Sequence, residues 1–285
     1  RVINYLSEKN FYVNNIYDFS DIIGQKLNKK KIITIDVGAQ GGFNSDNFFP
    51  KKYNTFFDSI LVEPIKEEAD KLKLENKLVI EKGLWSEKKV KKIYILGNRL
   101  GSSSMYQPNQ DLFSMHKIKK DDYDKYKITK TLDIECDRLD NSLTNLNVKK
   151  LDYLKIDTQG AELEILKGIG NFRPLLIRTE VQIFSLYKDV PSWNELINYL
   201  YKLNYIIIDW KTIGSHATRT PAEMDMIFIP NFKNKTGKEL IAENKDKFVS
   251  LMLIFGQLNL LKLILKECDF NSFNEINSFE DLYFN

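Results

Sequence analysis

Short runs rich in β-branched residues alternate with segments of helical length or spacing along most of this chain. The runs that indicate buried strands are residues 32–37, 60–63, 78–80, 151–156, 175–181, 205–210 and 224–229. The segments that indicate helices are residues 44–57, 66–74, 161–167 and 193–203. Because strands that alternate with helices form right-handed crossovers, the pattern predicts an α/β fold, with a mostly parallel sheet and helices on both faces.

Three regions are predicted along the chain. Residues 1–30 form a helical preface that ends in a lysine run, residues 31–232 form the sheet domain, and residues 233–285 form a helical extension. Within the sheet domain, residues 91–139 change to short strand-like runs around a polar stretch, and we expect an excursion over one edge of the sheet. The apolar helical pattern from Leu251 to Leu265 indicates a packing helix, with an oligomer contact as its alternative.

Composition narrows the class of protein. Of 285 residues, 43% are apolar, which suffices for a buried core. The 42 Lys and Arg residues against 39 Asp and Glu residues leave a net charge of only +3, too close to balance for a protein that grips a phosphate backbone. We therefore expect no nucleic-acid partner. Cys136 and Cys268 lie far apart without a Cys-x-x-Cys motif, so no disulfide framework or cysteine zinc site is predicted. No apolar run approaches the roughly 20 residues of a membrane span, and we expect a cytoplasmic protein.

A glycine-rich segment, Asp36-Val37-Gly38-Ala39-Gln40-Gly41-Gly42-Phe43, follows the first predicted strand. Such a turn lets a ligand touch the backbone, and it makes Gly38, Ala39, Gln40 and Gly41 candidate cofactor-binding residues. A dinucleotide fingerprint needs glycine two and five residues after Gly38, where this chain has Gln40 and Phe43. No Lys-Ser or Lys-Thr pair closes the loop, so a triphosphate is also disfavoured. An NAD(P)-dependent oxidoreductase is kept as the weaker alternative.

Acidic residues at two successive strand ends favour a ligand that carries positive charge and no phosphate. Asp36 ends the first strand, and Glu63-Pro64 ends the second, where a carboxylate can accept hydrogen bonds from both hydroxyls of a ribose. S-adenosylmethionine, with its ammonium and sulfonium groups, fits this pattern. After the third strand, Gly83-Leu84-Trp85 can border the adenine, with Leu84 as an apolar wall and Trp85 either as a stacking face or as ordinary core.

The chain resembles the FkbM-type methyltransferases over about Lys31 to Pro230. The resemblance is carried by Ile35-Asp36-Val37-Gly38-Ala39, Val62-Glu63-Pro64, Gly101-Ser102-Ser103-Ser104, and Leu154-Lys155-Ile156-Asp157-Thr158-Gln159-Gly160-Ala161-Glu162 with Ile165-Leu166-Lys167-Gly168. It implies a Rossmann-like methyltransferase sheet with helical additions at both termini, S-adenosylmethionine as the donor, and usually O-methylation of a hydroxyl on a sugar or another natural product. Gln159 stands where many members of the family carry Glu.

Three residues near predicted strand ends are candidate catalytic bases for an acceptor hydroxyl: Asp157, Glu180 and His216. Asp157 borders the expected cofactor crevice and is our first choice, with capping of the following helix as its alternative. Buried pairing with Arg178 is the alternative for Glu180, and a surface-loop position is the alternative for His216. Together with Asp225, Asp157 and Glu180 could instead hold a divalent metal ion, although their spacing establishes no metal site.

Other polar residues give weaker sequence evidence for a functional role. Ser103, in the run Ser102 to Ser104, is a candidate cofactor contact, with a plain serine-rich turn as the alternative. Glu162 falls in a first helical turn, where the helix dipole favours a carboxylate without any chemistry. The expected partner is a small-molecule or glycan acceptor, and the apolar C-terminal helix allows a homo-oligomer. A non-catalytic interaction module is the remaining alternative for the whole chain.

Overall fold

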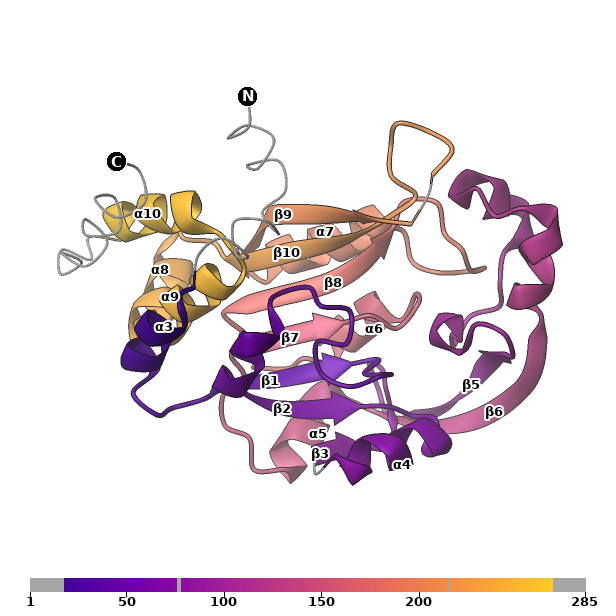
Figure 1. Cartoon of the computed structure of the whole chain (residues 1–285), viewed down its shortest axis with the longest axis horizontal. Coiled ribbons are helices and arrows are strands. Elements are labelled where there is room, and N and C mark those ends of the chain that lie inside the picture. Colours follow the sequence, from indigo (N-terminus) through magenta and orange to yellow (C-terminus); the bar gives the residue numbers. More distant parts are fainter. Residues whose placement is uncertain (1–17, 76–77, 215, 269–285) are drawn as a thin grey trace.

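The computed structural model describes residues 18–75, 78–214 and 216–268. Within these residues the strands form a seven-stranded sheet in the order β3-β2-β1-β7-β8-β10-β9 and a three-stranded sheet in the order β4-β6-β5 (Figure 1). The strands are β1 (Ile32–Val37), β2 (Phe57–Val62), β3 (Leu78–Ile80), β4 (Gly83–Leu84), β5 (Lys89–Leu96), β6 (Ile128–Asp137), β7 (Tyr153–Ile156), β8 (Leu176–Gln182), β9 (Tyr205–Ile213) and β10 (Glu223–Pro230).

The large sheet is mostly parallel, as the sequence predicts. β1 is parallel to β2 and β7, β2 is parallel to β3, and β7 is parallel to β8. Only β10 runs against its neighbours, because it is antiparallel to both β8 and β9. Parallel strands place their carboxyl ends at one edge of the sheet, so the loops that follow β1, β2, β7 and β8 meet there.

Helices cover both faces of the sheet. They are α3 (Ser20–Leu27), α4 (Lys66–Leu74), α5 (Leu139–Asn145), α6 (Glu162–Lys167), α7 (Trp193–Lys202), α8 (Lys235–Glu243), α9 (Lys245–Ile254) and α10 (Leu258–Glu267). Ile35 and Val62 share a hydrophobic cluster with residues of α5, α6 and α7. Ile32 and Tyr153, on the other face, share one with residues of α3, α8, α9 and α10. The expected α/β fold with helical additions is confirmed.

The terminal helices pack together beside the sheet (Figure 1). Phe19 and Ile23 near the start of the described chain are fully buried in the same cluster as Leu251 of α9. The C-terminal apolar pattern is therefore a packing element of the core. Its expected single helix is wrong, because Gly256 adopts φ +70° and separates α9 from α10. Residues 1–17 of the predicted preface and 269–285 of the extension lie outside the described residues.

The predicted helix over residues 44–57 is also wrong. Asn44 and Asn47 adopt left-handed backbone angles of φ +54° and +52°, which a continuous helix does not allow. The Asn44 side chain donates to the Phe49 carbonyl at 2.9 Å and so fixes the turn. Only a 3₁₀ helix, η1 (Lys51–Phe56), follows Pro50 before β2 begins. The connection from β1 to β2 is thus a loop that Asn44 and Phe49 anchor in the interior.

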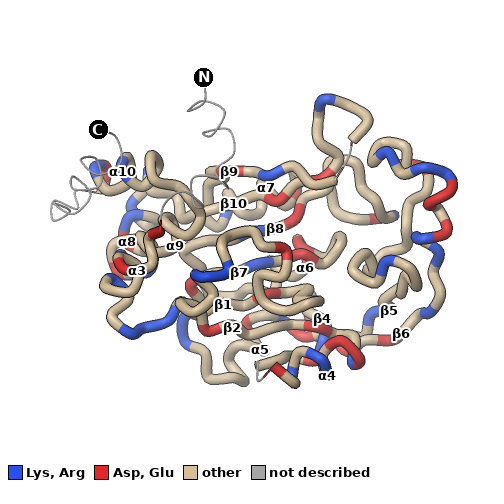
Figure 2. Tube along the Cα trace, viewed as in Figure 1, with Lys and Arg blue, Asp and Glu red and all other residues tan. Residues whose placement is uncertain are grey.

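The excursion predicted over residues 91–139 belongs to the small second sheet, which spans residues 83–137 and carries three 3₁₀ helices, η2 (Leu100–Ser102), η3 (Gln110–His116) and η4 (Lys120–Tyr126). β5 pairs with β6 in an antiparallel ladder from Lys89 with Cys136 to Leu96 with Ile128. The sequence pattern did not predict α5, which begins directly after this excursion. Lys and Arg residues are interleaved with Asp and Glu along most of the trace (Figure 2).

Candidate functional site

The glycine-rich turn joins the carboxyl ends of three neighbouring strands. The backbone N–H groups of Gly38 and Ala39 donate to the Val62 carbonyl at 3.1 and 3.2 Å, and the Asp157 N–H donates to the Val37 carbonyl at 3.0 Å. Gly38 has φ +78°, and a Cβ at this position would lie 1.9 Å from the Asp157 carbonyl oxygen. Only glycine therefore fits where β1, β2 and β7 meet.

A cleft opens over this turn, and we call it the apolar cleft. Its empty volume, including the part open to solvent, is about 650 Å³. Apolar side chains wall it: Leu84 and Ile93 come from the small sheet, Leu100 from η2, Ile65 from the residue before α4, and Ile165 from α6. Of the predicted cofactor-binding residues, the lining includes Gly38, Gln40, Glu63, Pro64, Gly83, Leu84, Ser103 and Asp157. The excursion thus supplies one wall of a cleft whose floor is the end of the sheet.

Glu63 is the buried carboxylate of the apolar cleft. It is only 4% exposed, and its Oε1 accepts a hydrogen bond from the Ile65 N–H at 2.9 Å. Among the described residues no other donor bonds to this carboxylate. Burial raises the pKa of Glu63 to about 7. A buried carboxylate with unfilled acceptor capacity at a strand end is suited to hydroxyl donors from a ligand.

Four predicted cofactor-binding residues do not line the apolar cleft. Trp85 is 4% exposed and belongs to the hydrophobic core beneath it, with Lys91 Nζ 4.2 Å from its ring centroid. Ala39 packs against Leu61 and Leu72, and Gly41 faces Ser45. The proposed stacking role of Trp85 is replaced by its core role. Asp36, the fourth, lines a second cavity.

This second cavity, the polar cavity, lies next to the apolar cleft, and the two share Gly38, Gln40, Gly101 and Asp157. Its empty volume, with the part open to solvent, is about 660 Å³. Charged residues from three strands and from the loop after β1 line it: Asp36, Asp46, Lys155, Asp157 and Arg178. Asp36 and Glu63 do come from the ends of adjacent strands, since Val37 pairs with Val62. Their carboxylates, however, serve two different cavities.

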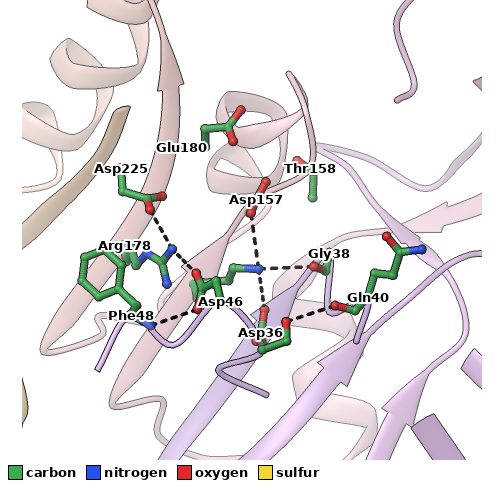
Figure 3. Close-up of polar contacts among 12 residues, drawn as sticks. Asp36, Gly38, Gln40, Asp46, Phe48, Asp157, Thr158, Arg178, Glu180 and Asp225 are labelled. Carbon is green, nitrogen blue, oxygen red and sulfur yellow. Dashed lines mark hydrogen bonds and ion pairs between the residues drawn. The ribbon is translucent and has the colours of Figure 1, made fainter. Parts of the chain in front are cut away.

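Lys155 connects two of the predicted acids. Its Nζ lies 3.0 Å from Asp36 Oδ1 and 3.7 Å from Asp157 Oδ2, and it donates to the Gly38 carbonyl at 3.2 Å (Figure 3). Burial alone would lower the pKa of Lys155, but the attraction of Asp36 and Asp157 outweighs it and raises that pKa. Burial raises the pKa of Asp36, and Lys155 opposes the rise. Lys155 therefore stays charged and holds the Asp157 carboxylate beside the glycine turn.

Arg178 is the second buried cation, only 4% exposed. Its Nη2 lies 2.7 Å from Asp225 Oδ2 and also pairs with Asp46, which reaches over from the loop after β1 (Figure 3). The guanidinium carbon sits 3.8 Å from the centroid of the Phe48 ring. The alternative for Glu180, a buried pairing with Arg178, is wrong, because the partners of Arg178 are Asp46 and Asp225. Although burial of Asp46 acts to raise its pKa, Arg178 lowers that pKa overall.

Gln159 bridges Asp157 and Glu180. Its Nε2 donates to Asp157 Oδ1 at 3.2 Å and to Glu180 Oε2 at 3.0 Å. The Tyr187 hydroxyl donates to Gln159 Oε1 at 2.8 Å, which fixes the orientation of the amide. Burial raises the pKa of Glu180 well above its usual range, and the neighbouring Asp157 adds to the rise. Burial likewise raises the pKa of Glu223 to about 7. Of the three carboxyl groups of Asp157, Glu180 and Glu223, that of Asp157 belongs to a residue that lines both cavities.

The other predicted acids and the histidine take different places. Glu162 accepts hydrogen bonds from the N–H groups of Thr158 and Gly160, so it fastens the loop before α6. His216 lies in the loop between β9 and β10 and lines neither cavity. The possible metal set of Asp157, Glu180 and Asp225 is not supported, since no group of three or more His, Cys, Asp or Glu among the described residues could hold a metal ion. Arg178 already neutralises Asp225.

A family model described as the methyltransferase FkbM domain matches residues 36–207, which is more than half of the chain. The chain belongs to the FkbM methyltransferase family. The match begins at Asp36 and contains the glycine turn, Glu63, Lys155 and Asp157. None of the curated proteins matches this chain. The residues that line the two cavities of this FkbM family member all lie within the matched region.

Solved structures of methyltransferases share a distant likeness with this family member. One is described as a DNA modification methyltransferase encoded within an E. coli prophage, at 11% identity over 74% of this chain and 50% of that chain, with a TM-score of 0.37. An S-adenosylmethionine-dependent methyltransferase from Clostridium acetobutylicum has 8% identity over 81% and 99% of the two chains, with a TM-score of 0.36. The 16S rRNA methylase ArmA has 13% identity over 79% and 86%, with a TM-score of 0.32.

This chain spans only half the length of the first of these structures. What the three proteins act on says nothing about the acceptor here, because likeness at these identities and TM-scores is too distant to carry substrate specificity. Within the described residues, no helix combines the length and the apolar character that crossing a bilayer requires.

Sequence reasoning missed three groups that shape the site. The sequence pattern singles out neither Lys155 nor Asp46 as a site residue. It indicates Arg178 only as a partner of Glu180. The available signal was a charged residue inside a strand predicted to be buried, since a buried Lys or Arg needs a carboxylate partner. Asp46 carried no such signal, because the turn that brings it to Arg178 was predicted to be a helix.

Proposed function

We propose that this FkbM family member transfers a methyl group from S-adenosylmethionine to a hydroxyl oxygen of a sugar, a glycan or a related small molecule. The observation that carries the proposal is the junction at Gly38 and Asp157, where an apolar cleft with one buried carboxylate meets a polar cavity. A nucleoside needs an apolar wall for its base and an acceptor for its ribose hydroxyls. An acceptor with a hydroxyl group needs a polar space beside it.

The residues of the apolar cleft fit S-adenosylmethionine. When bound, this cofactor supplies a methyl group on a positively charged sulfur. Glu63 would accept hydrogen bonds from the ribose hydroxyls, and Leu84 with Ile93 would wall the base. The Gly38 backbone leaves room for close approach, because it has no Cβ. Gln40, Pro64, Gly83 and Ser103 complete the proposed cofactor-binding set.

Asp157 is the proposed general base. It is 32% exposed, lines both cavities and has Lys155 on one side and Gln159 on the other. These two neighbours hold its carboxylate in place, so Asp157 can accept the proton that an acceptor hydroxyl loses. Glu180 is only 5% exposed, and the rise in its pKa favours its protonated form, so we give it a supporting role rather than that of the base.

Calorimetry with S-adenosylhomocysteine tests the cofactor assignment, and incubation with methyl-labelled S-adenosylmethionine tests the reaction. We expect the wild-type protein to bind S-adenosylhomocysteine, and we expect label in the products of a panel of saccharides and related hydroxyl compounds. A thermal shift with NAD(H) but none with S-adenosylhomocysteine would instead support the oxidoreductase alternative. Binding of the cofactor product without transfer to any acceptor in the panel would restrict the proposal to cofactor binding.

A further inference from the structure

The polar cavity holds buried polar atoms that the protein itself does not satisfy. Among the described residues, Arg178 Nε and Asp36 Oδ1 are buried and make no hydrogen bond. Asp36 Oδ1 lies 3.0 Å from Lys155 Nζ, which gives an ion pair but not hydrogen-bond geometry. An unsatisfied buried donor or acceptor costs about 1–3 kcal/mol, so such atoms are rare unless ordered water or a ligand completes them. Here the donor, Arg178 Nε, and the acceptor, Asp36 Oδ1, belong to residues that line the same cavity.

Among the described residues, both cations that line the polar cavity have carboxylate partners. Lys155 pairs with Asp36 and Asp157, and Arg178 pairs with Asp46 and Asp225. Two cations thus face four carboxyl groups. An incoming carboxylate or phosphate would have to displace one of these partners and lie beside the others, which is unfavourable at short range. Hydroxyl groups of a ligand can accept from Arg178 Nε or donate to Asp36 without adding charge.

The loop after β1 makes this arrangement specific. Asp46, whose side chain is 39% exposed, reaches from that loop to Arg178, and Phe48 from the same loop stacks on the guanidinium. Phe48 also lies 5.8 Å from Phe255, between ring centroids, at the end of α9. The loop is therefore anchored on the C-terminal helices, and it keeps a carboxylate on the outer side of Arg178. Asp46 thus adds a partly exposed negative charge to the wall of the polar cavity.

We propose that the polar cavity is the acceptor subsite, and that Arg178 and Asp46 make it select uncharged hydroxyl-bearing ligands over anionic ones. The inference rests on the proposed function for the neighbouring apolar cleft. Arg178 binds the acceptor hydroxyl through its free edge, and Asp46 opposes carboxylate or phosphate groups. Gly38 and Asp157, which line both cavities, mark where acceptor and cofactor meet.

Saturation-transfer NMR tests this inference with the full chain and S-adenosylhomocysteine present. The probes are methyl glucoside as the uncharged ligand, and glucuronate and glucose 1-phosphate as the anionic ones. We expect methyl glucoside to bind at least about tenfold more tightly than either anion. Equal or tighter binding of the anions, or no binding of methyl glucoside, overturns the proposal.

Three variants locate the effect. Asp46→Asn removes one partly exposed charge from the cavity wall, so we expect the preference for methyl glucoside over the two anions to fall by about fivefold, chiefly because the anions bind more tightly. Arg178→Lys keeps the charge but lacks the guanidinium edge, and it should weaken methyl glucoside binding. Asp58→Asn is the matched control, because Asp58 is exposed on β2 and lines neither cavity. An unchanged preference in Asp46→Asn would count against the proposal even if Arg178→Lys failed to fold.

Calorimetry with S-adenosylhomocysteine on the same samples separates this inference from the proposed function. If the wild type does not bind S-adenosylhomocysteine, the proposed function fails. If it binds, and both Asp46→Asn and Arg178→Lys weaken that binding while methyl glucoside binding is unaffected, the polar cavity holds the amino-acid end of the cofactor and only the acceptor inference falls.

Discussion

Gly38 and Asp157 lie in such close contact that the position of a Gly38 Cβ would be 1.9 Å from the Asp157 carbonyl oxygen. This contact joins the first strand of the sheet to the strand that carries the proposed base. Gly38 and Asp157 each line both the apolar cleft and the polar cavity. The geometry of the site therefore depends on one position without a side chain.

Replacing Gly38 by Ala should damage both stability and cofactor binding. The new Cβ overlaps backbone, and φ +78° is unfavourable for any L side chain, so we expect a loss of at least about 2 kcal/mol in the free energy of unfolding. Urea unfolding and calorimetry with S-adenosylhomocysteine measure the two effects. Gly24→Ala in α3 is the control, since its Cβ would meet only Phe56 at 3.9 Å, and it should be neutral or stabilising.

Glu63→Gln should weaken S-adenosylhomocysteine binding about tenfold or more, because an amide accepts from one oxygen only. The pKa of Glu63 near 7 adds a pH signature. Two ribose hydroxyls favour the ionised carboxylate, so wild-type affinity should rise as the pH passes upward through 7. In Glu63→Gln this dependence should be absent. Calorimetry at several pH values checks it, and an identical pH profile in both proteins would remove Glu63 from the cofactor site.

The same group should affect stability with a definite sign. The pKa of Glu63 is about 7 in the folded protein against an ordinary 4.5, so the folded state binds the proton more tightly. The cost of burying the charge is absent below the lower value, grows as the pH rises between the two, and reaches about 3 kcal/mol above the upper one. Urea unfolding of Glu63→Gln should lack this loss of stability. A parallel pH course in wild type and variant would contradict it.

Asp157→Asn should separate catalysis from cofactor binding. The amide keeps the shape but cannot take a proton, so turnover should fall by about a hundredfold to ten thousandfold. Affinity for S-adenosylhomocysteine should change by less than about threefold, because Lys155 keeps Asp36 as a partner. Transfer of labelled methyl groups and calorimetry give the two readings. The control is Asp124→Asn, which changes an exposed residue of η4. Full turnover in Asp157→Asn would exclude Asp157 as the base.

Leu251→Ala tests whether the C-terminal helices belong to the core of the sheet domain. Leu251 is fully buried in the cluster that also contains Phe19 and Tyr153, so its truncation should cost about 2–5 kcal/mol of unfolding free energy. Leu263→Ala in α10 offers the matched control, since Leu263 is 45% exposed and should cost less than about 1 kcal/mol. Thermal and urea unfolding of both variants decide the matter. Equal effects would show that α9 contributes little to the core.

The local pattern of the sequence was sufficient for much of the sheet. β-branched runs gave the strands of the large sheet, and β1 and β3 have the predicted bounds. The glycine spacing predicted the turn after β1, because left-handed backbone angles and close packing both require glycine. The position of Glu63 at a strand end could also be predicted, because the short-range sequence pattern determines where a strand ends. The resemblance of the segment from Lys155 to Glu162 to FkbM-type methyltransferases indicated the family.

The tertiary structure alone decided which charges meet. Arg178 and Asp46 are 132 residues apart, and no periodicity links them. Their pairing depends on a turn fixed by the Asn44 side chain, and the sequence pattern predicted a helix there. Trp85 and Leu84 are neighbours in sequence and share one hydrophobic cluster, yet only Leu84, the last residue of β4, lines the cleft. Local preferences determine strands and turns, but the partners of a buried charge are set by long-range packing, to which no short stretch of sequence has access.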